Sequence, residues 1–141
     1  MKILESNALR EARMLTKAKQ AVLTSDSWLT IDDIARRTNS TVKLTGALLL
    51  KWEREHQIFS IQHEGTDYYP SYIFDQNFLP HPSFASVLKV FATDKGSWTP
   101  AFWFISVSGL LGGKRPLDLI HSEPTRVVVA AEDEVAGISH G

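Results

Sequence analysis

Apolar side chains recur at every third or fourth position near the start of the chain, which is the spacing of one face of an α-helix. The stripe follows Ser6, a residue type that caps helix N-termini, and it stops at the polar run 24–27. We therefore predict a first helix over about residues 7–23. Its expected buried face consists of Leu9, Ala12, Leu15, Ala18 and Val22.

Two more helical patterns follow, each introduced by a threonine. Thr30 precedes an apolar position and two acids, which suit the first turn of a helix over residues 31–38. Residues 39–41 predict a tight turn with a fresh cap, and a third helix is predicted over 42–55. The expected buried face of this third helix consists of Leu44, Leu48, Leu49 and Trp52.

The period then changes from helix to strand. Residues 58–62 alternate in part and favour a strand, Glu64-Gly65 supplies a turn, and residues 66–69 predict a return strand that Pro70 ends. A helix pair followed by a hairpin is the order expected of a winged or MerR-like helix-turn-helix, a DNA-binding fold.

The second half returns to helical patterns that glycine and proline interrupt. We predict helices capped by Ser83 and by Thr99, a short helix opened by Pro116, and a last helix that Pro124 opens and Gly137 ends.

These elements predict a mainly α fold with a small β-hairpin. We expect a helix-turn-helix domain with its hairpin over residues 1–75 and a small helical bundle over residues 76–141. With 43% hydrophobic residues, four Trp and seven Phe, the chain can form a sizeable core. The absence of cysteine excludes disulfides and thiolate metal sites. No apolar run reaches the roughly 20 residues that cross a bilayer, so we expect a cytoplasmic protein without membrane contact.

The net charge of −1 conceals an asymmetry. Residues 1–56 hold ten Lys and Arg against seven Asp and Glu, a net of +3, which permits a basic patch in the first half. On the third predicted helix, three cations and one small residue recur at steps of four, four and three, so long side chains on one face can reach phosphates and base edges. The candidate DNA-binding residues are Arg36, Arg37, Thr41, Lys43, Ala47, Lys51 and Arg54.

Two observations keep an alternative open. A stripe of cations is also the ordinary solvated face of a surface helix. The hairpin tip around Glu64 is acidic, which makes it a poor phosphate-binding wing.

The most informative stretch is 98–131. It contains an aromatic-rich segment with Phe102-Trp103-Phe104, followed by Leu110-Leu111-Gly112-Gly113-Lys114-Arg115-Pro116-Leu117-Asp118-Leu119-Ile120. This pattern resembles the C-terminal toxin-binding domain of the Xre/MbcA/ParS antitoxins. The segment 69–75 also resembles a joint motif of one branch, although Ile73 stands where that branch more often has Gln. The resemblance spans about residues 28–136.

The resemblance implies a non-enzymatic antitoxin of a type II toxin-antitoxin system. Such a protein binds and inhibits a RES-domain toxin, which consumes NAD, and represses its own promoter. The implied partners are a RES-type toxin, promoter DNA and a second copy of the chain, since a homodimer reads a palindrome. We expect no cofactor and no metal, because the five histidines are scattered.

Three successive rings cannot all face inward on one helix, so we expect at least one of them to meet another surface. The candidate partner-binding residues are Phe102, Trp103, Leu111, Lys114, Arg115 and Ile138. Two alternatives stay open. The chain is either a stand-alone helix-turn-helix regulator or excisionase-like factor whose C-terminal half dimerises, or an interaction protein without DNA activity.

Overall fold

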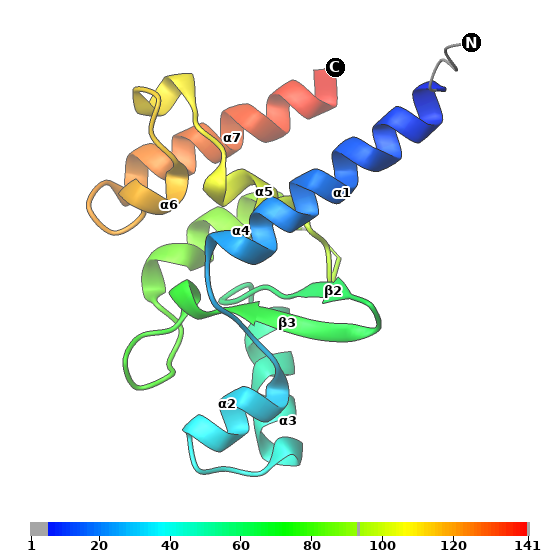
Figure 1. Cartoon of the computed structure of the whole chain (residues 1–141). Coiled ribbons are helices and arrows are strands. Elements are labelled where there is room, and N and C mark those ends of the chain that lie inside the picture. The colour runs from blue at the N-terminus through cyan, green and yellow to red at the C-terminus, as the bar shows by residue number, and fades with distance from the viewer. Residues whose placement is uncertain (1–5, 93, 141) are drawn as a thin grey trace.

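The chain forms seven α-helices and a small antiparallel sheet in the residues that this computed structural model describes, 6–92 and 94–140 (Figure 1). None of the helices in these ranges is long and apolar enough to span a membrane. The helices are α1 (Asn7–Ser25), α2 (Ile31–Arg37), α3 (Val42–Arg54), α4 (Ala85–Phe91), α5 (Thr99–Ile105), α6 (Pro116–Leu119) and α7 (Pro124–His140). The strands are β1 (Trp28–Leu29), β2 (Ile61–His63) and β3 (Thr66–Pro70), and single 3₁₀ turns are η1 (Ser71–Ile73), η2 (Pro82–Phe84) and η3 (Gly109–Leu111).

Side-chain caps start the first three helices where the sequence predicts them. The hydroxyl of Ser6 caps α1 and that of Thr41 caps α3, each accepting from the backbone N–H three residues on at 3.1 Å. In α2 the cap is reciprocal: the hydroxyl of Thr30 accepts from the Asp33 N–H, and the Asp33 carboxylate accepts from the Thr30 N–H. These bonds satisfy N–H groups that have no partner within the helix, so they determine where each helix begins.

The sheet has β3 in its centre, in the order β1-β3-β2, with both pairings antiparallel. The predicted hairpin is therefore present, but it carries a third strand that was not predicted. The prediction was wrong at the start of the first hairpin strand, because β2 begins at Ile61. Ile58 and Phe59 are buried in the core instead, so their apolar character reflects burial outside the sheet.

In the second half, prolines mark the start of the helices better than the predicted cap residues do. Proline occupies the first turn of α5 and α6, and α7 begins at one. Three details of the prediction were wrong. A 3₁₀ turn without a side-chain cap precedes α4, so Ser83 is not its cap. Trp98, rather than Thr99, stands at the cap position of α5. Gly137 lies inside α7, which runs on to His140.

One cluster of buried apolar side chains spans both sides of residue 75. The rings of Phe59 and Phe104 stack with centroids 6.0 Å apart, and those of Tyr72 and Phe84 with centroids 5.8 Å apart. The two predicted domains therefore share a core.

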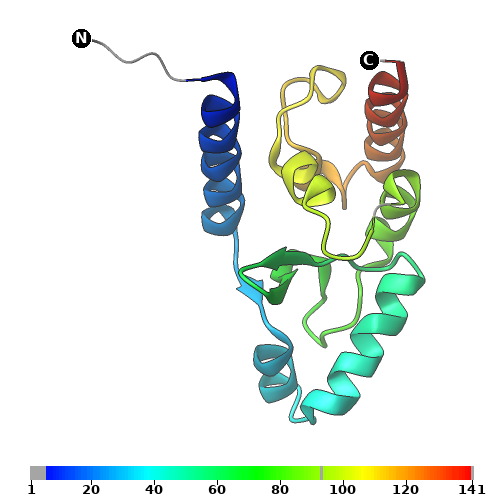
Figure 2. The same cartoon turned by 90° about the vertical axis from the view of Figure 1, so that its right-hand side faces the viewer.

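The first helix leaves this core along most of its length. Val22 is buried, whereas Leu9 and Leu15 are exposed, so the predicted buried face was wrong over the N-terminal part of α1. In Figure 2, α1 and α7 extend toward one end of the molecule, and α2 and α3 form the opposite end.

Candidate functional site

The cationic face of α3 has the exposure that the sequence predicts. The side chains of Lys43, Ala47, Lys51 and Arg54 are all exposed. At 100° per residue they lie within an arc of about 80°, so they project from one side of the helix. The Nζ atom of Lys51 lies 3.9 Å from the Oε1 atom of Glu55, one turn on, so this pair partly neutralises the charge of Lys51. The two ends of the face, Lys43 and Arg54, are basic.

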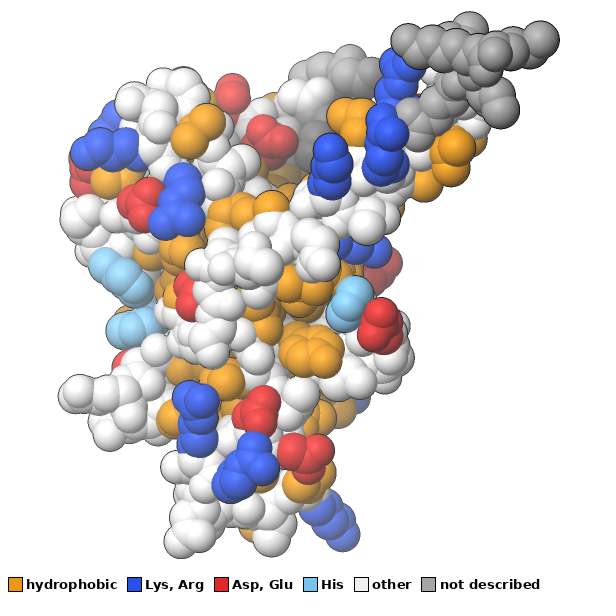
Figure 3. Space-filling model, viewed as in Figure 1, with side chains coloured by type: hydrophobic (Ala, Val, Ile, Leu, Met, Phe, Trp, Pro, Cys, Tyr) orange, Lys and Arg blue, Asp and Glu red, His pale blue; other side chains and the backbone are white. Residues whose placement is uncertain are grey.

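The other candidate DNA-binding residues lie next to this face. Arg36 and Arg37 are exposed at the end of α2, where Arg36 reaches the carboxylate of Asp33 at 2.6 Å. Thr41 is exposed, and its hydroxyl oxygen already accepts a hydrogen bond as the cap of α3. The turn between α2 and α3 therefore brings Arg36, Arg37, Thr41 and Lys43 close together, while Ala47, Lys51 and Arg54 follow along α3 toward the sheet. Figure 3 shows Lys and Arg side chains over this lower part of the molecule.

Two leucines predicted to be buried are exposed beside the cations. Leu44 is 65% exposed and Leu48 is 43% exposed, whereas Leu49 is buried as predicted and Thr45 is buried although it was not predicted to be. Together with Phe78 and Leu79, the two leucines line a cavity of about 270 Å³. The open side of α3 is thus partly basic and partly apolar.

The β2–β3 hairpin turns at Glu64-Gly65, with Gly65 at a φ of +79°. Asp67 on β3 lies 3.7 Å from the Lys95 ammonium group, which neutralises one of the acids of the hairpin. Glu64 at the tip is exposed, so the tip of the hairpin presents an acidic side chain to solvent.

The glycine turn of the second half is a structured loop. Gly112 and Gly113 adopt φ values of +65° and +78°, the left-handed region that favours glycine. Beyond it, Arg115 donates two hydrogen bonds to the carboxylate of Asp118, at 3.0 and 2.8 Å. These bonds hold the pKa of Asp118 below its usual value. Arg126 on α7 donates to the Leu110 carbonyl at 3.3 Å and fastens the other side of the loop.

The structure separates the six candidate partner-binding residues. Trp103 is 7% exposed and Leu111 is 1% exposed, which corrects the prediction that both meet a partner directly; their side chains complete the chain's own core. Phe102 is half-buried against Trp98, Lys114 is exposed, and Arg115 is tied to Asp118. The side chain of Ile138 lies outside the described residues.

Sequence reasoning missed the apolar side chains that are exposed in this half. Val107 is 71% exposed, and Leu110 and Val129 are also exposed. Val107 and Leu110 line a cleft of about 490 Å³ with Glu134 of α7. The sequence held one signal for this exposure. Val107 and Leu110 stand in a glycine-rich segment, which is typical of a surface loop.

The turn between α2 and α3 and the loop 106–115 lie at opposite ends of the molecule (Figure 1). Among the residues that the structure describes, no group of three or more His, Asp or Glu side chains is placed to hold a metal ion.

Comparisons with protein-family models, with curated proteins and with solved structures give no match for this chain.

Proposed function

We propose that this chain is a DNA-binding regulator of the winged helix-turn-helix class, with α3 as its recognition helix. One observation carries the proposal. The order α1-β1-α2-α3-β2-β3, with β3 between β1 and β2, supports that class, in which a helix pair precedes a hairpin, and the basic side of α3 is exposed. A helix presented in this way fits the width of a DNA major groove.

The second half adds a surface for a protein partner. The exposed apolar side chains of Val107 and Leu110 stand on a loop that two glycines and Arg126 shape. A rigid loop with apolar side chains supports protein binding, because little order is lost when a partner covers it. With the resemblance to Xre/MbcA/ParS antitoxins, this supports an antitoxin that neutralises a RES-domain toxin and represses its own promoter.

A homodimer completes the proposal. Reading a palindromic operator requires two copies of the chain. The exposed Leu9, Met14 and Leu15 of α1 are side chains that a second copy could cover. Sedimentation of the free protein and of its DNA complex tests the stoichiometry.

Gel-shift assays across a salt series test the DNA interface. The double variant Lys43→Ala with Lys51→Ala should bind the promoter of the chain's own gene more weakly. A plot of the logarithm of the binding constant against the logarithm of the salt concentration should become less steep by about two, roughly 0.9 for each phosphate that is no longer neutralised. The matched control is Lys89→Ala with Lys114→Ala, which removes the same charge from exposed positions elsewhere. Equal DNA affinity and equal salt dependence of the two double variants would show that this face of α3 does not contact the DNA.

Co-purification tests the partner surface. Deleting residues 98–141 is unsuitable, because Phe104 and Ile120 belong to the core. The double variant Val107→Asp with Leu110→Asp should no longer capture the protein encoded by the neighbouring gene. The control is Leu79→Asp, because Leu79 is also exposed but lies near α3, and this variant should capture that protein as the wild type does. Capture that survives the double variant contradicts the proposed surface.

The exposed Leu44 and Leu48 favour a second candidate function, an interaction protein whose α3 docks on a polypeptide rather than on DNA. Leu44→Gln with Leu48→Gln separates the two. Loss of a protein complex in this variant, together with a wild type that does not bind promoter DNA, favours the second candidate.

A further inference from the structure

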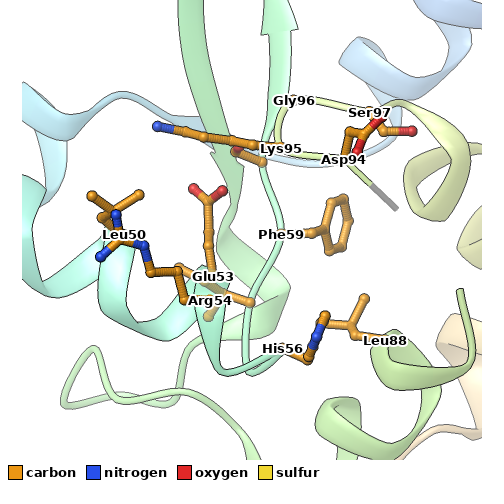
Figure 4. A pocket seen from close by; sticks show the side chains of 12 residues that line it. Leu50, Glu53, Arg54, His56, Phe59, Leu88, Asp94, Lys95, Gly96 and Ser97 are labelled. Carbon is orange, nitrogen blue, oxygen red and sulfur yellow. The ribbon is translucent and has the colours of Figure 1, made fainter. Parts of the chain in front are cut away.

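The cavity of about 360 Å³ beside the C-terminal end of α3 contains its own counter-charges. The carboxylate of Glu53 accepts hydrogen bonds from the hydroxyls of Tyr69 and Ser60, which oppose the rise that burial causes in its pKa. Figure 4 shows Arg54 and Lys95 at the same cavity. Charges of both signs therefore line this cavity, whereas α1 and α7 each present charge of mostly one sign.

The N-terminal half of α1 has an apolar face that is exposed in the described chain. Leu15 stands seven residues, almost two whole turns, before the buried Val22, so both side chains point to the same side of the helix. Leu15 is nevertheless 48% exposed, and Leu9 is exposed as well. An amphipathic helix draws most of its stability from the packing of its apolar face. This half of α1 is therefore suited to pack on a further surface.

A basic stripe runs beside this apolar face. It consists of Arg10, Arg13 and Lys17, which are exposed and lie within an arc of about 60° at 100° per residue. Glu11 is the one acid in the 19 residues of α1. Figure 3 shows Lys and Arg side chains gathered along this helix. A surface that covers α1 must therefore be acidic as well as apolar.

Such a surface, which we call the acidic cleft, lies between α5 and α7. It consists of two hollows of about 300 and 490 Å³, which adjoin because Trp103, Ser106 and Glu134 line both of them. Phe102 lines the first hollow and Asp133 the second. The acidic cleft therefore combines aromatic side chains with two carboxylates.

The acids of α7 are available to cations from outside the chain. Glu134 follows the buried Val127 by seven residues and the buried Ala130 by four, so it lies on the core-facing side of α7, but its side chain is exposed. Within the described residues, no salt bridge uses Glu132, Asp133 or Glu134. The acidic cleft thus carries negative charge that the described chain does not neutralise.

Charge favours one of two ways in which a second copy can cover α1. Packing α1 on the α1 of another copy would set two basic stripes side by side, whereas packing it in the acidic cleft brings opposite charges together. In Figure 2, α1 and α7 extend toward the same end of the molecule, so one partner copy can meet both of them.

We propose that α1 of one copy packs in the acidic cleft of a second copy, and that a twofold axis repeats the contact. The apolar face of α1 then meets Phe102, and the basic stripe meets Asp133 and Glu134. This inference rests on the homodimer proposed above and names its contact. Helix α3 takes no part in it.

Charge reversal in the free, full-length chain tests the contact. One double variant, Arg10→Glu with Lys17→Glu, reverses the basic stripe. The other, Asp133→Lys with Glu134→Lys, reverses the acidic cleft. Sedimentation velocity should show that each variant dimerises at least about tenfold more weakly than the wild type, because like charges then face each other at both symmetric contacts.

A mixture of the two double variants is the decisive measurement. Their heterodimer pairs an acidic α1 with a basic cleft at one contact and a basic α1 with an acidic cleft at the other. It should therefore form about as strongly as the wild-type dimer, and native mass spectrometry identifies it by its mass. Recovery of the dimer also shows that both variants are folded.

Two matched controls reverse the same amount of charge elsewhere. Lys43→Glu with Arg54→Glu changes α3, and Glu64→Lys with Asp94→Lys changes the hairpin tip and the loop before α5. All four residues are exposed. Both controls should dimerise as the wild type does.

The possible failures are distinguishable. A dimer that persists at wild-type strength in either reversed variant, or a mixture without the heterodimer, overturns the contact and leaves the homodimer in place. A wild type that is monomeric at every concentration overturns both. Loss of promoter binding by the wild type would count against the proposed regulator alone, because dimerisation is measured without DNA.

Discussion

The ring of Phe59 stacks on that of Phe104 at an angle of 14°, and this contact joins the segment after α3 to the last turn of α5. Phe104 is fully buried and also packs edge-to-face on Phe84, with centroids 5.4 Å apart. Both halves of the chain therefore depend on the same aromatic cluster. Helices α2 and α3 and the glycine loop are attached to one body.

Phe104→Ala should lower the free energy of unfolding by about 3–5 kcal/mol, the usual cost of removing a buried aromatic ring. Unfolding should occur in a single transition because the core is shared. Urea unfolding followed by tryptophan fluorescence and by circular dichroism measures both. Val107→Ala, at an exposed position, should stay within about 0.5 kcal/mol of the wild type. Separate transitions for the two probes would show independent domains.

Local signals predicted where most helices begin. Ser6, Thr30 and Thr41 cap their helices through hydrogen bonds within three residues, and proline lies in the first turn of α5, α6 and α7. Features that depend on distant segments were missed. Strand β1 is two residues long, too short to show a period, and it is defined by its pairing with β3.

The buried side of a helix likewise depends on what packs against it. Leu44 and Thr45 are adjacent, and spacing alone favours the leucine for the core, yet Thr45 is buried. The exposure of Lys43 and Lys51 was predictable, because long cationic side chains are rarely buried. The pairing of Glu53 with Ser60 at a cavity was not, since neither residue stands in a motif and only the fold brings them together.

Gly112→Val should lower the free energy of unfolding by about 1–3 kcal/mol, because a β-branched residue is strained at a φ of +65°. An added Cβ would lie 3.9 Å from the Arg126 guanidinium, an ordinary contact, so the cost comes from backbone strain alone. Thermal denaturation measures the effect. Gly109→Ala is the matched control, since Gly109 has open space and no positive φ. Equal stability of the two variants would contradict the strained turn.

The pair His81 and His121 predicts an acid sensitivity. Their ring centroids are 4.6 Å apart, and partial desolvation of the His121 ring, followed by the charge of His81, lowers the pKa of His121 from 6.5. The unfolded chain then binds the proton more readily, so this contribution to stability is complete above pH 6.5 and is lost as the pH falls through the lowered pKa. His121→Asn should make the melting temperature depend less on pH between pH 7 and pH 5, about the range in which histidines titrate. His81→Asn should reduce this dependence in part, and an unaltered slope in His121→Asn would refute the assignment.

Glu53→Gln should stabilise the protein at neutral pH. Burial raises the pKa of Glu53 above 4.5, against the opposing effect of the Tyr69 hydrogen bond and the Lys95 charge. Between pH 4.5 and the raised pKa the folded protein holds the extra proton, so stability falls as the pH rises through that window and stays lower above it. The neutral glutamine avoids this loss and keeps an oxygen that can accept from Tyr69. Melting temperatures of the two proteins should differ most near pH 8 and converge below about pH 4, where glutamate is protonated in both states. A variant that is less stable than the wild type at pH 8 would mean that Glu53 is ionised and fully paired in the folded chain.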